Sequence, residues 1–172
     1  MRTLVLFACS LVLAAALAVA PASATRRTAP TNGTLSVVRG KGFVMLEMRG
    51  SILGRLGSGT VTVTDQTPRD PYTATVGGKK LKQTPLGPRT TRYKGQALRF
   101  RMVGGSWRVV VRGSGIALSA VGRGAVTLQA DRLNPLDDAG VYSLDGVDCS
   151  ADTTSCTPLP DDLERFPLGV SQ

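Results

Sequence analysis

Apolar and polar residues alternate through the middle of the chain, as they do in strands that bury one face. In residues 98–102, leucine, phenylalanine and methionine alternate with arginine, and in residues 107–112 the side chains of Trp107, Val109 and Val111 share one face. No stretch repeats with the 3.6-residue period of an amphipathic helix. The pattern predicts an all-β domain, most simply a β-sandwich, with a small barrel as the alternative.

Two parts of the chain repeat one order of strands and glycines. Residues 35–50 resemble residues 98–113, and residues 57–63 resemble residues 122–128. Each copy is interpreted as strand, glycine turn, strand, Arg-Gly corner, strand, Gly-x-Gly turn and strand. Similar composition alone is the alternative, but the shared order of turns favours a duplicated four-strand unit. The predicted copies occupy residues 34–65 and 97–130.

The segment between the copies, residues 66–96, is rich in proline, threonine and basic residues. Residues 72–76 and 79–83 are predicted to form a hairpin around Gly77 and Gly78. Long connections in compact domains are often functional, so a mobile segment that faces a partner is one interpretation. An ordinary solvated excursion is the other, and it is the commoner case.

The first 24 residues have the pattern of a secretory signal peptide. Arg2 supplies a positive charge, residues 4–20 are almost continuously apolar, and Ala22-Ser23-Ala24 predicts cleavage before Thr25. A retained membrane anchor is the alternative, because a spanning helix needs about 20 apolar residues. We expect residues 25–172 to form a single secreted or cell-envelope-associated domain, with no stable membrane span after cleavage.

Residues 131–172 are predicted to form an acidic hairpin region held by a disulfide. Residues 141–144 have the composition of a strand and precede an Asp-Gly turn, and Phe166 and Leu168 suit an edge strand that tolerates Pro167. Cys149 and Cys156 are the only cysteines left after cleavage, and export makes a disulfide their default state. Their C-x₆-C spacing differs from that of redox-active C-x-x-C motifs.

Charge divides the mature chain into two parts. Residues 25–130 hold 18 basic and 3 acidic side chains, whereas residues 131–172 hold 9 acidic and 2 basic ones. The acidic tail packing beside the basic body is one interpretation. The other is a basic surface for an anionic partner outside the cytoplasm, such as an anionic cell-wall polymer or an acidic polysaccharide. Export makes nucleic acid a poor candidate.

The composition also excludes several chemistries. The chain has no histidine, which removes the Ser-His-Asp triad and imidazole metal sites, and three cysteines are too few for a Cys₄ zinc site. The spacing of the tail carboxylates matches no EF-hand loop. We therefore expect no catalytic residues, metal or cofactor. The tail carboxylates are Asp137, Asp138, Asp145, Asp148 and Asp152.

Four arginines are the candidate anion-binding residues: Arg99, Arg101, Arg108 and Arg112. If Gly104 and Gly105 form a two-residue turn, Arg101 lies directly opposite Arg108 on the outer face of a hairpin. Like charges in such a pair are destabilising, and an anion between them relieves the repulsion. The alternative is that both guanidinium groups extend into water.

The second half of the chain resembles small exported β-rich proteins of high-GC bacteria. The residues that carry this resemblance are Gly113-Ser-Gly-Ile116, residues 121–128, Tyr142-Ser-Leu-Asp-Gly146 and Pro158-Leu-Pro160. The resemblance implies a fold and a compartment, and it carries no activity.

The function expected from these observations is that of an exported, non-enzymatic binding or structural module of the cell envelope. Its basic sheet face is the predicted binding surface for an anionic polymer. The alternatives are a carbohydrate-active hydrolase that uses the tail carboxylates, and an assembly subunit that contributes strand edges.

Overall fold

The computed structural model describes residues 31–134 and 137–169, and the regular elements in these ranges are all β-strands. The predicted all-β fold is therefore confirmed. Among the described residues no helix has the length and apolar character needed to cross a membrane. The predicted signal peptide, residues 1–24, lies outside the described residues.

Two long strands dominate a single antiparallel sheet. The strand order is β2-β3-β1-β4-β7, and β5 pairs with both β1 and β6. The long strands are β1 (Gly33–Asp65) and β4 (Ser106–Ala130). The others are β2 (Thr75–Gly87), β3 (Thr90–Met102), β5 (Val141–Ser143), β6 (Thr157–Pro158) and β7 (Glu164–Leu168).

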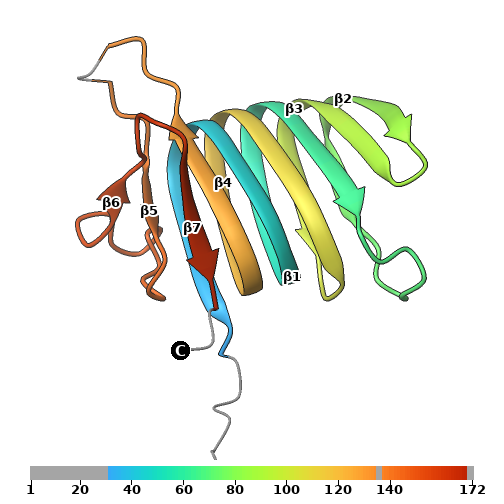
Figure 1. Cartoon of the computed structure of the whole chain (residues 1–172). Helices are drawn as coiled ribbons and strands as arrows, with labels where there is room; N and C mark the ends of the chain where they lie inside the picture. Colours follow the sequence, from blue (N-terminus) through green and yellow to red (C-terminus); the bar gives the residue numbers. More distant parts are fainter. Residues whose placement is uncertain (1–30, 135–136, 170–172) are drawn as a thin grey trace, which may run out of the picture.

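β1 and β4 pair with each other twice, once along each edge. Val44 of β1 lies opposite Val111 on one side and opposite Leu128 on the other, so two different parts of β4 flank it. The two strands therefore form a ribbon that winds into a spiral, and each turn of the ribbon pairs with the next. Figure 1 shows segments of β1 and β4 alternating along the molecule.

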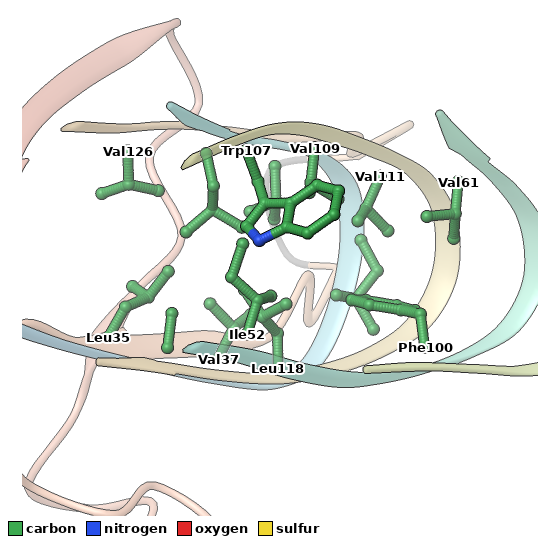
Figure 2. Close-up of a cluster of buried hydrophobic side chains, with 14 of the residues drawn as sticks. Leu35, Val37, Ile52, Val61, Phe100, Trp107, Val109, Val111, Leu118 and Val126 are labelled. Carbon is green, nitrogen blue, oxygen red and sulfur yellow. The ribbon is translucent and has the colours of Figure 1, made fainter. Parts of the chain in front are cut away.

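The spiral is flattened into two layers that enclose the core. Figure 2 shows Leu35, Ile52 and Phe100 facing Trp107 and Val109 across the interior, and all five side chains are buried. The first layer comprises residues 34–38 and 51–56 of β1, 116–121 of β4, 98–102 of β3 and 75–77 of β2. The second layer comprises residues 42–49 and 60–65 of β1, 106–112 and 124–130 of β4, 90–94 of β3 and 82–87 of β2.

Glycines form the corners at which the strands pass from one layer to the other. Gly42, Gly113, Gly59 and Gly95 lie opposite one another in adjacent strands. Gly113 has φ of 145° and Gly59 has φ of 141°, a region that L side chains rarely adopt. A Cβ atom on Gly113 would collide with the carbonyl oxygen of Ser58. The row of glycines therefore lets four adjacent segments of β1, β3 and β4 bend together while their ladder hydrogen bonds continue.

This geometry corrects two sequence predictions. The glycine turns expected inside residues 34–65 are bends within one strand, so the predicted four strands are the single strand β1. The predicted hairpin around Gly77 and Gly78 is also wrong, because β2 continues through both residues and the chain reverses between Gly87 and Thr90. A Cβ atom on Gly78 would touch the side chain of Leu98, so this glycine provides room for packing. The duplication itself stays a prediction.

The C-terminal region closes one end of the spiral. β7 pairs with β4 as an edge strand that contains Pro167, as predicted, and β5 pairs with β1. The rings of Tyr142 and Phe166 lie 5.4 Å apart between centroids, and Leu168 is buried against the core. The predicted disulfide between the two tail cysteines, Cys149 and Cys156, is present. The acidic tail therefore packs on the basic body.

We expect substitution of a corner glycine to destabilise the protein strongly. Gly113→Ala places a Cβ atom against a backbone carbonyl at positive φ, which should cost at least about 1–3 kcal/mol of unfolding free energy in a denaturant titration. The matched control is Gly77→Ala, because a Cβ atom there meets nothing within 4 Å. The control should change stability by less than about 1 kcal/mol. Equal effects of the two substitutions would contradict the role assigned to the corners.

Candidate functional site

A groove of about 800 Å³ lies on the outer face of the first layer. Its floor consists of small side chains from neighbouring strands: Ser36 of β1 lies opposite Ser119 of β4, and Ala117 lies two residues before Ser119. Arginine side chains of β1 and β3 lie on one side of these residues, and residues 146–150 lie on the other. The hollow thus follows from a row of small outward-facing residues. Its volume is within the usual range of ligand sites, roughly 300–1,000 Å³.

Three arginines form one wall of the groove. Arg55 of β1 lies directly opposite Arg99 of β3, and Arg101 of β3 lies opposite Leu53 of β1. All three arginines are exposed, and none belongs to an ion pair within the described part of the chain. Three uncompensated cations therefore converge on one concave surface. We call Arg55, Arg99 and Arg101 the arginine wall.

Apolar side chains lie beside the arginine wall. Leu53 is 49% exposed and Val121 is 46% exposed, and both line the groove together with Val38. Guanidinium groups bind phosphate and carboxylate through paired hydrogen bonds, and exposed apolar carbon suits the weakly polar part of a ligand. The groove therefore combines anion recognition with an apolar contact surface.

Residues 146–156, which include the segment closed by the disulfide and which we call the disulfide loop, form the opposite wall. Gly146, Val147, Asp148 and Ser150 line the groove, and the backbone N–H of Cys149 donates a 3.1 Å hydrogen bond to Ser36 Oγ on the floor. The disulfide closes this loop close to its contact with β1. The cross-link restrains the loop, and the hydrogen bond attaches it to β1.

One carboxylate faces the groove from this loop. Asp148 Oδ1 accepts hydrogen bonds from the hydroxyl of Ser150 at 2.8 Å and from its backbone N–H at 2.9 Å. These hydrogen bonds, the hydroxyl first, lower the pKa of Asp148, so the carboxylate is charged at neutral pH. The groove therefore has cations on one wall and an anion on the other, with apolar side chains between them.

The four arginines singled out in the sequence do not form one site. Arg99 and Arg101 belong to the arginine wall, whereas Arg108 and Arg112 lie in the second layer. Arg108 Nε lies 3.3 Å from Glu47 Oε1, and the Arg112 guanidinium lies 4.7 Å from the centroid of the Phe43 ring. Arg108 thus has a partner within the protein, and Arg112 stacks on an aromatic ring.

The predicted pairing of Arg101 with Arg108 is wrong. Arg101 lies opposite Leu53 and Thr75, and Arg108 lies opposite Glu47 and Thr64. The reason is that residues 103–105 connect β3 in the first layer to β4 in the second layer. β1 pairs with β3 and with β4 along the edges at which the predicted hairpin would have paired these two strands with each other.

The sequence prediction also missed Arg55. This residue continues the outward face of β1 two positions after Leu53, but nothing in its local pattern distinguishes it from other exposed arginines. Its proximity to Arg99 depends on the β1–β3 register, which joins residues 44 positions apart in the sequence. The like-charge pair in the structure is Arg55 with Arg99, which belong to β1 and β3, and not the predicted pair from β3 and β4.

Four of the tail carboxylates, Asp138, Asp145, Asp148 and Asp152, accept hydrogen bonds in local turns. Asp138 accepts from the backbone N–H of Gly140, and Asp145 accepts from the hydroxyl of Ser143 and the N–H of Leu144. Asp152 accepts from Thr154 and Ser155, and these hydrogen bonds lower its pKa to about 2. A general acid needs the opposite shift, a raised pKa. Asp137, like Asp138, does not line the groove.

Searches with known proteins give no identification. The chain has no significant match among protein-family models, curated proteins or solved structures. Among the described residues, no group of three or more acidic, cysteine or histidine side chains is placed to hold a metal ion. The groove therefore has to be interpreted from its own chemistry.

We expect the arginine wall to lower the stability of the protein without a bound anion. Arg99→Gln removes a like-charge cross-strand pair, so it should raise the unfolding free energy at low salt by a few tenths to about 1 kcal/mol. The gain should shrink at high salt, because salt screens exposed charges. Arg92→Gln is the control, since Arg92 lies between Thr62 and Thr84. A stability loss in Arg99→Gln would contradict the repulsion.

The disulfide loop should respond to acid through Asp152. Because the folded-state pKa of about 2 lies below the ordinary aspartate value of 3.8, the hydrogen bonds of this carboxylate stabilise the loop above about pH 4. That contribution is lost as the pH falls through 2. The side-chain carboxyl resonance of Asp152 should titrate near pH 2 in an NMR experiment. A midpoint near 4 would show that the turn does not hold the carboxylate.

Proposed function

We propose that this protein is an exported, non-enzymatic module of the cell envelope that binds an anionic polymer in the groove of its first layer. The observation that carries the proposal is the arginine wall, in which three unpaired guanidinium groups from adjacent strands face one hollow. Arginines that were buried or already paired with carboxylates would not be able to bind an anionic ligand. Here the cations are available, and an anion would relieve their mutual repulsion.

The neutral part of the groove supports a polymer as the ligand. Anionic cell-wall polymers and acidic polysaccharides alternate charged groups with weakly polar carbon. The arginine wall matches the charged groups, while Leu53, Val121 and the small floor residues match the segments between them. The disulfide is compatible with an oxidising compartment outside the cytoplasm.

The two alternative functions receive less support from the structure. The tail carboxylates of a hydrolase would have to include a general acid, yet the pKa values of Asp148 and Asp152 are lowered. An assembly subunit would need strand edges that are open to pairing. The edges of this sheet contain Pro85 in β2 and Pro167 in β7, and the pairing of β2 with β3 has irregular register. These features oppose edge-to-edge association.

The test compares two double variants with equal charge. Arg99→Ser with Arg101→Ser should weaken retention of the mature protein on anionic cell-wall material at least tenfold, because each guanidinium group contributes charge-assisted hydrogen bonds. The same variant should reduce the dependence of retention on salt. Retention is measured by co-sedimentation at two salt concentrations.

Arg108→Ser with Arg112→Ser is the matched control, because it removes the same charge from the opposite layer. We expect it to retain nearly all of the binding. Circular dichroism confirms that both variants are folded. Equal losses in the two variants would assign retention to net charge, and loss in the control alone would move the site to the second layer. Either result would refute the groove as the binding site.

A further inference from the structure

The two ends of the spiral differ in how they are covered. At one end β5, β6 and β7 lie against the ribbon, and Phe166 and Leu168 of β7 pack against the core. At the other end β2 is the last strand of the sheet, and no described strand pairs with its outer edge (Figure 1). Every residue of β2 except Val76 is exposed.

The exposed β2 end has a distinct composition. Lys79, Lys80 and Lys82 surround Leu81, which is 39% exposed, and Leu86 further along the strand is 47% exposed. Within the described part of the chain none of the three lysines belongs to an ion pair. The end of the sheet therefore combines free cations with exposed leucine side chains. We call these five residues the β2 end.

The neighbouring strand extends the positive charge. Lys82 lies opposite Lys94 of β3, and Arg92 of β3 lies opposite Thr84 of β2. Lys94 and Arg92 are exposed and are also outside every ion pair of the described residues. Tyr93 between them is only partly exposed and packs against the core. Alternation along β3 thus directs its cations outward beside the lysines of β2.

We propose that the β2 end docks on an anionic membrane surface. Basic side chains are attracted to acidic lipid headgroups, and exposed leucines enter the boundary between headgroups and acyl chains. A second copy of the chain is a poor occupant of the same edge, because a symmetric contact would place lysine against lysine. The acidic tail of this chain lies at the other end of the spiral. This surface is separate from the groove, which none of the five residues lines.

The test uses vesicles that contain no cell-wall polymer. The mature protein should co-sediment with vesicles of phosphatidylglycerol and phosphatidylcholine, and only weakly with vesicles of phosphatidylcholine alone. Each lysine near an anionic surface contributes about a fivefold factor, so Lys79→Ser, Lys80→Ser and Lys82→Ser together should weaken partitioning on the order of 100-fold. Leu81→Ser with Leu86→Ser should also weaken it while leaving the charge unchanged.

Two controls make the result specific. Arg49→Ser, Arg112→Ser and Arg123→Ser together remove the same charge without touching the β2 end, and should retain most of the binding. The groove variant Arg99→Ser with Arg101→Ser should bind vesicles nearly as well as the unmodified protein, even though its retention on anionic cell-wall material is weakened. Equal losses in the two triple variants, unchanged binding after the leucine substitutions, or no preference for anionic vesicles would each overturn the proposal.

Discussion

The structure depends on the ability of β1 and β4 to bend without interrupting their hydrogen bonds. A straight strand of 33 residues would extend far beyond any core that a chain of this size can build. The bends occur where glycines of neighbouring strands coincide, because a side chain there would meet the carbonyl group of the adjacent strand. The register between β1 and β4 therefore has to place these glycines opposite one another. A shift of one residue between β1 and β4 would move the glycines away from one another and also turn the core side chains outward.

The bent ribbon explains both candidate surfaces. Because adjacent segments of the first layer come from β1, β4, β1 again and β3, the small residues and the arginines reach one face from distant parts of the chain. The groove is the place where small side chains meet between the arginine wall and the disulfide loop. A spiral also has two ends, and the tail covers one of them, which leaves β2 at the other. The face of the first layer offers a groove that combines arginines with apolar side chains, and the end of the spiral offers a basic strand with exposed leucines.

The local pattern of the sequence predicts much of this fold. Alternation correctly identifies Phe100, Met102, Trp107 and Val109 as core residues, and all four are buried. The disulfide and the edge strand around Pro167 are also predicted correctly, because cysteine usage and proline chemistry act locally. These predictions need only information about residues close together in sequence.

The remaining features depend on which strands become neighbours, and alternation does not contain that information. The same pattern of Phe100 and Trp107 fits a hairpin between β3 and β4 and fits two strands in opposite layers. The sequence predicts a Gly-x-Gly turn at Gly122 and Gly124 because glycine often reverses a chain, yet β4 continues through both residues. For the same reason alternation places Arg99 and Arg101 on one outward face of a strand, whereas the proximity of Arg55 depends on the register between β1 and β3.

Chemical-shift mapping with a short phosphodiester oligomer tests the central claim most directly. The claim is that the bent ribbon brings Arg55, Arg99 and Arg101 together as one anion site beside the disulfide loop. Upon titration, the guanidinium Nε–H resonances of these three arginines and the amides of residues 146–150 should shift together with one dissociation constant. Arg108 and Arg112 should stay unchanged. Shifts centred on Arg108 and Arg112, or spread evenly over all exposed arginines, would contradict the account.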